Sequence, residues 1–398
     1  MCRDFPSRQR RVRVRYGNSL VIVEISQTLL SIQYTQHLLF CCHSIQHTFR
    51  SIITMQSIPS VFRGGIPKHN LLRAQTRTCR ISRHFSGTPS TTPSNVSTQA
   101  QNRNLVQSRD YESFVIGLLH PATIQPSYYA LRAFHVEIAS IRSKESSVAS
   151  MRMKWWFDTI QSLYTSPGQS NNSSTRGNPT IMGLDQAIQS HNLTQRFLER
   201  MVETRMGDLQ KGSNGRFDTM NDMITFFERT NSAFLFLNLE CCGVIDEEAD
   251  KVANCVGIAS GIINMIRSIG CGHVGIPNDL IEKYGVQEGC IHDPTKIIAG
   301  DEEEARIAIR NSVRDMAEIA GKYLSHARLH QGDVPNEGKS AMLPAVSALR
   351  YLDRLKGVNF DVFEEKIRDV ENIESLNGRF WRFGHLLYLG RAQMTGVF

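Results

Sequence analysis

Long apolar segments are scarce in this 398-residue sequence. Uninterrupted apolar runs such as Leu20–Val23 and Leu38–Cys42 are far shorter than the roughly 20 residues that a helix needs to cross a bilayer. The sequence therefore predicts no transmembrane helix. Hydrophobic residues nevertheless make up 41% of the chain, which is enough for a sizeable globular core.

The cysteine patterns of disulfide frameworks are also missing. The chain has nine cysteines, an odd number, and contains no Cys-x-x-Cys pair. This usage is typical of reduced thiols in a reducing compartment. The pairs Cys271/His273 and Cys290/His292 have an atypically tight spacing for zinc, so we predict no metal site.

Acidic residues are nearly absent from the N-terminal part of the chain. Residues 1–85 contain 13 Lys and Arg but only two acidic residues, and Met55–Phe85 contains none. An Arg-rich, Ser/Thr-rich and acid-poor leader is typical of a mitochondrial transit peptide. We therefore interpret residues 1–85 as a disordered mitochondrial targeting extension, with Met1 or Met55 as its start.

The remainder of the chain has no excess of positive charge. Residues 86–398 hold 32 Lys and Arg against 36 Asp and Glu, so the net charge of +7 arises in the N-terminal extension. A domain that binds nucleic acid needs a basic face. We therefore predict no nucleic-acid partner.

Helical periodicity dominates the sequence after a polar segment. Residues 86–107 are rich in Ser, Thr, Asn and Gln, and they predict a flexible linker. Beyond it, apolar residues recur three and four positions apart, as in Tyr128–Arg142 and Val252–Arg267. Such stripes are typical of helices packed side by side. The sequence thus predicts an all-α fold with a single helical bundle over residues 108–398.

Five segments, in order along the chain, resemble motifs of the squalene/phytoene synthases. They are Tyr129–Phe134, Arg152–Trp156, Gly257–Arg267, Pro277–Val286 and Leu343–Phe363. Each match is weak alone, but together they are specific because they keep their order. The resemblance implies an isoprenoid-synthase-like helical bundle.

Further similarities point to one branch of that family. Residues 130–137, 151–156 and 191–196 resemble the branch that acts in the biogenesis of respiratory complex I. The resemblance implies complex I subunits or other assembly factors as partners, and a place on the matrix side of the mitochondrial inner membrane. Composition and spacing alone indicate neither these partners nor the matrix-side location.

The carboxylates that such synthases use are missing from the matching positions. These enzymes hold an allylic diphosphate through Mg²⁺ ions, which prefer carboxylate ligands. The first aspartate cluster would fall at Ala139, Ser140 and Ser143, and the second would begin at Ser268. Both halves of the metal site are absent. We therefore predict a pseudo-enzyme with no catalytic residues and no cofactor.

Two literal Asp-x-x-x-Asp pairs occur elsewhere, at Asp218/Asp222 and Asp246/Asp250. Each pair lies at the start of a predicted helix. Acidic residues are common there because they cap exposed N–H groups and face the positive end of the helix dipole. We interpret both pairs as structural.

A vestigial ligand pocket remains a hypothesis. Glu137 lies on the apolar stripe of its helix, where a carboxylate must be paired or protonated. Arg152 and Arg267 are its candidate partners, and the same arginines would suit a phosphate-bearing ligand. The predicted pocket residues are Phe134, Glu137, Arg152, Asn264 and Arg267.

The C-terminal segment Arg379–Gln393 mixes arginines with aromatic and leucine side chains. Such a helix can lie on an anionic membrane or pack into a core. Packing into a core is the commoner case, and a peripheral contact with the inner membrane through this segment is the alternative.

Three functions are compatible with these patterns. The first is a non-catalytic assembly factor for complex I. The alternatives are a divergent prenyl or lipid transferase that uses other carboxylates, and a non-catalytic isoprenoid or lipid carrier at the inner membrane.

Overall fold

The computed structural model places two units, Met1–Ser86 and Gly87–Phe398, which are described separately. It describes residues 10–16, 19–25, 95–141, 146–165, 177–210, 216–273, 275–293, 295–300, 302–371 and 376–397.

In the first unit the described residues form a β-hairpin. Strand β1 (Arg10–Tyr16) pairs antiparallel with β2 (Ser19–Ile25), and Val12 lies opposite Val23. Arginine and valine alternate along β1, and β2 is rich in β-branched residues, a composition that favours strands. This hairpin lies within the predicted N-terminal extension, outside residues 108–398 for which the all-α bundle is predicted. The rest of the predicted extension lies outside the described residues.

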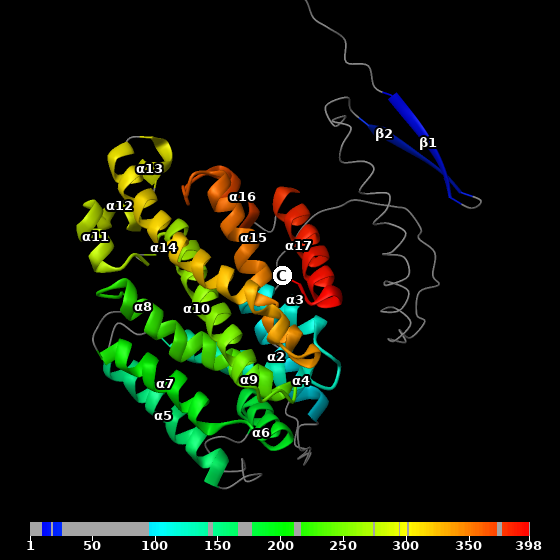
Figure 1. Ribbon diagram of the computed structural model, residues 1–398, viewed down its shortest axis with the longest axis vertical. Helices are drawn as coiled ribbons and strands as arrows, with labels where there is room; N and C mark the ends of the chain where they lie inside the picture. Colours follow the sequence, from blue (N-terminus) through cyan, green and yellow to red (C-terminus); the bar gives the residue numbers. More distant parts are fainter. Residues whose placement is uncertain are drawn as a thin grey trace, which may run out of the picture. The chain divides into compact units, whose positions relative to one another are not determined.

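The second unit is helical, as predicted (Figure 1). Its elements are α2 (Asn95–Arg109), α3 (Tyr111–Leu119), α4 (Gln125–Ala139), α5 (Ser146–Thr165), α6 (Pro179–His191), α7 (Gln195–Gln210), α8 (Met220–Phe227), the π-helix η2 (Glu228–Ser232), α9 (Ala233–Cys241), α10 (Glu247–Gly270), α11 (Asn278–Tyr284), α12 (Glu288–His292), α13 (Thr295–Ala299), α14 (Glu303–Leu329), the 3₁₀ turns η3 (Gln331–Asp333) and η4 (Asn336–Met342), α15 (Pro344–Gly357), α16 (Glu365–Glu371) and α17 (Leu376–Thr395).

Helix α10 is the centre of the bundle. It contacts α8, η2, α9, α14 and α15, and its apolar stripe is buried as the sequence predicts. By length and composition α10 could cross a membrane, and 61% of its most apolar window is buried inside the bundle. No long uninterrupted apolar run marks this helix in the sequence, because Asn, Ser and Gly interrupt its apolar residues.

The structural interpretation is confirmed for Asp222 and for the pair Asp246/Asp250, while Asp218 accepts from Asn278 Nδ2 at 3.1 Å. Asp246 is the N-cap of α10, where its carboxylate accepts from Ala249 N at 2.8 Å, and Asp250 lies in the first turn. Asp222 forms a capping box with Thr219 at the start of α8. Both arrangements satisfy N–H groups that a helix start leaves without partners.

Helix α2 occupies most of the segment predicted as a linker. Val106 and Asn102 are buried, and Asn102 Nδ2 donates to Pro179 O at 2.9 Å. The linker prediction over 86–107 is thus wrong from residue 95 onward. The helix was missed because it is polar overall and is held by packing against α4 and α6 rather than by a strong apolar stripe.

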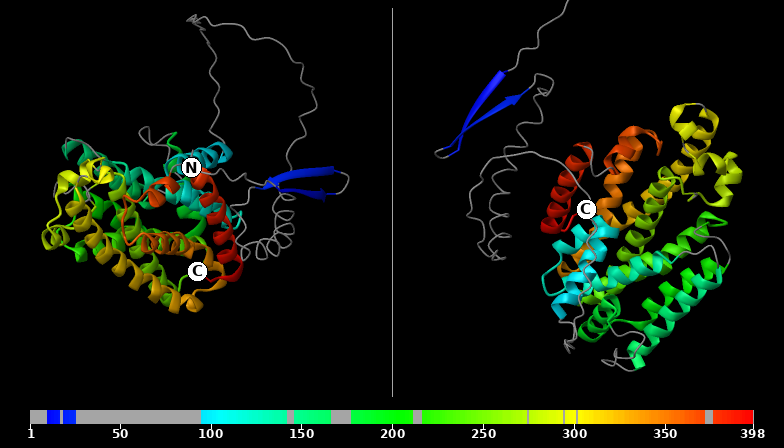
Figure 2. Two further views of the ribbon diagram at one scale, coloured as in Figure 1. Left: turned by 90° about the horizontal axis from the view of Figure 1, so that it is seen from above. Right: turned by 180° about the vertical axis from the view of Figure 1, so that it is seen from behind.

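Helix α17 covers the predicted membrane segment and packs on one face only. It lies beside α15 and α16 in both views of Figure 2, where it is red and they are orange. His385, Leu389 and Ala392 are buried. Leu386 and Leu387 are exposed, and Tyr388 is exposed beside α15, where its ring centre lies 4.4 Å from the Arg350 guanidinium.

Candidate functional site

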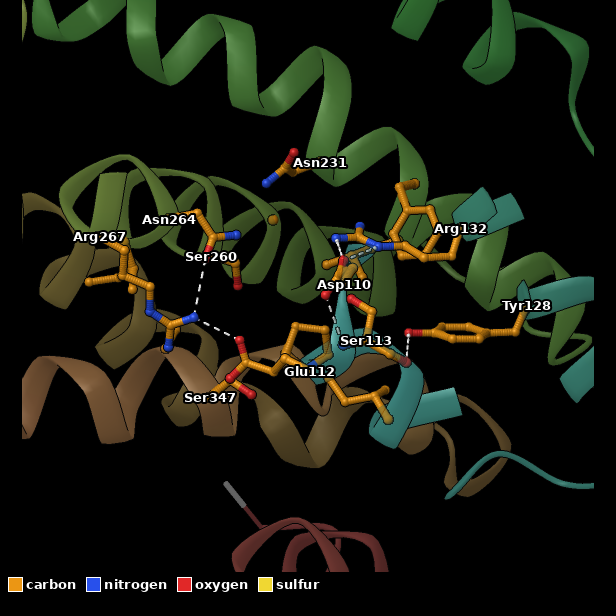
Figure 3. A pocket seen from close by; sticks show the side chains of 17 residues that line it. Asp110, Glu112, Ser113, Tyr128, Arg132, Asn231, Ser260, Asn264, Arg267 and Ser347 are labelled. Atoms are coloured by element: carbon orange, nitrogen blue, oxygen red, sulfur yellow. Dashed lines mark hydrogen bonds and ion pairs between the residues drawn. The ribbon is translucent and has the colours of Figure 1, made fainter. Parts of the chain in front are cut away.

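A cavity of about 300 Å³ lies between α3, α4, η2, α9, α10 and α15 (Figure 3). Four charged side chains face it, two acidic ones from the start of α3 and two arginines from the opposite walls. They are Asp110, Glu112, Arg132 and Arg267. Each carboxylate is paired with one arginine, so the formal charges in the cavity cancel.

The first pair joins α3 to α4. Asp110 is the N-cap of α3 and accepts from Ser113 N at 3.0 Å. Its second oxygen accepts from Arg132 Nε at 2.7 Å and also from Arg132 Nη2. Burial alone would lower the pKa of Arg132, but the charge of Asp110 raises it. Arg132 therefore stays charged and directed at Asp110.

The second pair joins α3 to α10. Arg267 Nη1 donates to Glu112 Oε2 at 2.7 Å, and the guanidinium lies 4.6 Å from the ring centre of Tyr351. His385 Nε2 of α17 lies 3.3 Å from the other carboxylate oxygen. Burial would raise the pKa of Glu112, yet the charge of Arg267 and the hydrogen bonds from His385 and Arg267 hold it well below its ordinary value. Glu112 is thus ionised and links three helices.

A neutral polar wall completes the cavity. It is formed by the side chains of Asn231, Ser260 and Asn264. Ser260 Oγ is buried and makes no hydrogen bond within the described part of the chain. A hydroxyl without a partner costs free energy when it is buried, so this wall is able to hydrogen-bond a small molecule.

Behind Arg132 lies a buried histidine. His135 Nδ1 is 2.8 Å from Arg132 Nη1, and His135 Nε2 is 3.3 Å from Arg205 Nη2. Burial and the two guanidinium charges lower the pKa of His135 well below its ordinary value. The imidazole is therefore neutral. It continues a row of polar side chains that runs from the cavity toward α7.

The sequence matches the squalene/phytoene synthase family over residues 106–372. The chain belongs to the squalene/phytoene synthase family. It is 31% identical to "NADH dehydrogenase (ubiquinone) complex I, assembly factor 6" of Rattus norvegicus, over 69% of this chain and 78% of that protein. The Homo sapiens protein of the same name is 29% identical, over 68% of this chain and 77% of that protein.

Solved structures show the same fold. A squalene synthase of Alicyclobacillus acidocaldarius superposes with a TM-score of 0.54 at 15% identity, covering 67% of this chain and 96% of that one. A dehydrosqualene synthase superposes with a TM-score of 0.56 at 12% identity, covering 76% and 98%. The prediction of an isoprenoid-synthase-like bundle is confirmed for the second unit.

In this family member, the structure brings only two of the five predicted pocket residues to the cavity. Asn264 and Arg267 line it, and Arg267 Nη1 lies 3.5 Å from Asn264 Oδ1. Phe134 is fully buried and packs edge-on against Trp156.

The other two predicted residues lie away from the cavity. Glu137 accepts a hydrogen bond from Thr180 on α6, and Arg152 is exposed on α5. Burial raises the pKa of Glu137, and the Thr180 hydrogen bond and the charge of Arg152 offset it only in part. Phe134, Glu137 and Arg152 therefore do not line this cavity: Phe134 and Glu137 lie on α4 toward α5 and α6, and Arg152 lies on α5.

Sequence reasoning missed Asp110, Glu112 and Arg132. Arg132 carried a signal, since it interrupts the apolar segment Ala130–Phe134. Asp110 resembles an ordinary helix cap, which it also is, and nothing in the sequence distinguishes Glu112 from a surface acid. Their pairing depends on contacts between distant segments.

The positions expected for the family's aspartates make only local contacts. Ser140 Oγ donates to Val136 O at 2.7 Å, and Ser268 Oγ donates to Met265 O at 2.7 Å. Ser143 lies outside the described residues. Among the residues that the structure describes, no three His, Cys, Asp or Glu side chains gather as metal ligands would.

Proposed function

We propose that this chain is a non-catalytic assembly factor for mitochondrial respiratory complex I. Its relatives of about 30% identity carry that role in their names, and they are matched over more than three quarters of their length. The acid-poor, Arg-rich N-terminal residues support a mitochondrial location. The partners would be complex I subunits or other assembly factors on the matrix side of the inner membrane.

One observation carries the non-catalytic part of the proposal. Mg²⁺-dependent ionisation of a diphosphate needs carboxylates that are available to the metal. Here the carboxylates at the cavity, Asp110 and Glu112, each bind an arginine at 2.7 Å. A metal would have to displace a guanidinium from each, and a diphosphate would have to compete with both carboxylates.

Depletion of the protein from its own cells tests the assembly role. Mitochondria would be resolved on native gels, and the activity of each respiratory complex measured. We expect a selective loss of complex I that the full chain restores. Equal loss of all complexes, or normal complex I, would contradict the proposal.

A second assay separates this proposal from the prenyl transferase alternative. The purified full chain would be incubated with farnesyl diphosphate and Mg²⁺, and pyrophosphate release followed. We expect none above the buffer rate. Release that depends on both protein and Mg²⁺ would establish an enzyme. Lipid extracted from the same preparation would instead favour the carrier alternative.

We also propose that the exposed face of α17 contacts the inner membrane. Leu386 and Leu387 are each 37% exposed and Tyr388 is 54% exposed, and the exposed Arg391 follows on the same helix. Apolar side chains with neighbouring arginines suit the interface of an anionic bilayer.

Vesicle sedimentation tests this contact. The full chain should sediment with vesicles that contain phosphatidylglycerol and less with pure phosphatidylcholine. Leu387→Glu should reduce sedimentation several-fold, because a carboxylate enters the interface poorly and is repelled by anionic lipid. Ile245→Glu, at a 93% exposed position between α9 and α10, is the matched control and should sediment normally. Equal sedimentation of both variants would rule out this face.

A further inference from the structure

A groove of about 570 Å³ lies between α14 and α15, and it is separate from the central cavity. We call it the α14–α15 groove. Ala317, Gly321 and Phe360 provide apolar surface within it, and Leu329 lies at the end of α14 with 82% of its surface exposed. Hollows between the helices of a bundle are common places for a ligand or partner to bind.

Gly321 lines the groove on the α14 side. A Cβ atom at this position would meet only Leu352 Cδ2, at 3.5 Å, which is an ordinary contact. The backbone therefore does not require glycine here. In the middle of a helix glycine is less favourable than alanine by about 1 kcal/mol. A large side chain at this position would enter the hollow, whereas a methyl group would leave most of it open.

The backbone beside the groove is strained. Asn359 and Phe360 both have positive φ values, 53° and 63°. Asparagine tolerates this conformation, but for a bulky residue such as Phe360 it is rare and costs about 1–3 kcal/mol. Arg314 supports the turn, since its Nη2 donates to Asn359 Oδ1 at 3.2 Å and its guanidinium lies 5.5 Å from the Phe360 ring centre. This strained turn places the Phe360 ring at the groove.

The charges at the groove indicate the kind of ligand. Lys322 on α14 and Lys356 on α15 are exposed on the two walls, and Glu318 is the one acidic residue among those that line it. A concave site between two helices is out of reach of a flat bilayer. It fits a third helix whose apolar side chains enter the groove while acidic side chains meet the lysines.

We propose that the α14–α15 groove binds an amphipathic helix of a partner protein, with apolar anchors and flanking acidic residues. The inference rests on the proposed function, in which the chain acts by holding other proteins. It identifies the surface of this chain that binds the partner, and it states the chemistry of the partner segment that binds there. The occupant is a helix of another protein rather than a second copy of this chain.

A defined peptide pair tests the recognition. The probe is a labelled helical peptide of about 18 residues, or five turns, with leucines on one face and glutamates flanking them. The matched peptide carries lysine in place of each glutamate. By fluorescence anisotropy with the full chain, the acidic peptide should bind at least about tenfold more tightly, a difference of about 1.4 kcal/mol. Equal affinity of the two peptides would overturn the proposal.

Variants of the groove locate the binding. Gly321→Trp should fill the hollow and weaken the acidic peptide at least about tenfold, whereas Gly321→Ala should bind within about twofold of the unmodified chain. Lys322→Glu with Lys356→Glu keeps the hollow and should reverse the preference between the peptides. This surface pair still tests the proposal if the tryptophan variant does not fold. A peptide affinity that none of these substitutions changes would overturn the proposal.

Rescue of depleted cells distinguishes failure of this inference from failure of the proposed function. Gly321→Ala should restore complex I, and Gly321→Trp should not, at equal protein levels. Restoration by both would refute the groove while leaving the assembly role intact. Normal complex I in depleted cells would refute the assembly role, and the peptide measurements would then decide the groove alone. Sedimentation equilibrium that shows a dimer lost in Gly321→Trp would identify a second copy as the occupant and overturn the proposal.

Discussion

Replacing Gly257 with alanine should destabilise the bundle by about 3 kcal/mol or more, although only one methyl group is added. A Cβ atom at Gly257 would lie 2.6 Å from the backbone N and Cα of Ser232. Backbone atoms cannot rotate away as the end of a side chain can, so α10 and η2 would have to separate.

The local structure explains why this approach is so close. Ser232 ends the π-helix η2, whose wider turn brings its backbone against α10. One turn further along α10, a Cβ at Gly261 would lie 2.2 Å from Phe227. Gly257 thus lets α10 approach the backbone of η2, Gly261 makes room for the Phe227 side chain of α8, and Gly257 itself lines the central cavity.

Urea unfolding of the full chain measures the effect, with Gly207→Ala as the matched control. Gly207 is also in a helix, but a Cβ there would meet nothing within 4 Å. The control should gain roughly 0.5–1 kcal/mol, because alanine reduces the entropy of the unfolded chain. If both alanine variants changed stability alike, close packing at Gly257 would not be the cause.

The sequence predicted the bundle better than it predicted the cavity. Apolar spacing and helix caps are local, so the stripe of α10 and the cap at Asp246 could be identified without coordinates. The order of the five family motifs supplied the rest of the fold. Helix α2 was not predicted because its stability comes from the burial of a few residues against α4 and α6. Local periodicity in the sequence gives no sign of such contacts.

The cavity could not be predicted because its pairs join distant segments. Glu112 and Arg267 are 155 positions apart, and either residue alone resembles a surface charge. The predicted partner for Arg267 was Glu137, which instead lies on the other side of α4 with Thr180. Helical spacing predicts the face of its own helix on which a residue lies. It does not predict which other helix packs against that face. Three of the five predicted pocket residues therefore lie away from this cavity, even though their helices were predicted.

Neutralising Glu112 should cost about 2 kcal/mol of folding free energy, because Arg267 would keep its charge without its main partner. A fully buried pair would cost more, about 3–5 kcal/mol, and an exposed one about 0–1 kcal/mol. Here the two side chains are 31% and 22% accessible, which places the pair between these limits. A cycle of Glu112→Gln, Arg267→Met and the double variant should give a coupling energy of about 2 kcal/mol.

The pH dependence of the same variants provides a second signature. The folded state holds the pKa of Glu112 below its ordinary value of 4.5. The pair therefore stabilises the fold at every pH above 4.5, and this contribution is lost as the pH falls through the lower folded pKa. The stability gap between the unmodified chain and Glu112→Gln should shrink in that window and stay constant at neutral pH.

The exposed pair Lys154–Asp158 on α5 is the matched control for both measurements. Its side chains are 61% and 55% accessible, and Asp158→Asn should change stability by less than about 0.5 kcal/mol. A coupling energy for Glu112 and Arg267 as small as that of the exposed pair would mean that water, rather than the guanidinium, solvates the carboxylate. The argument that Glu112 holds Arg267 would then fail, and with it the main physical argument against a diphosphate in this cavity.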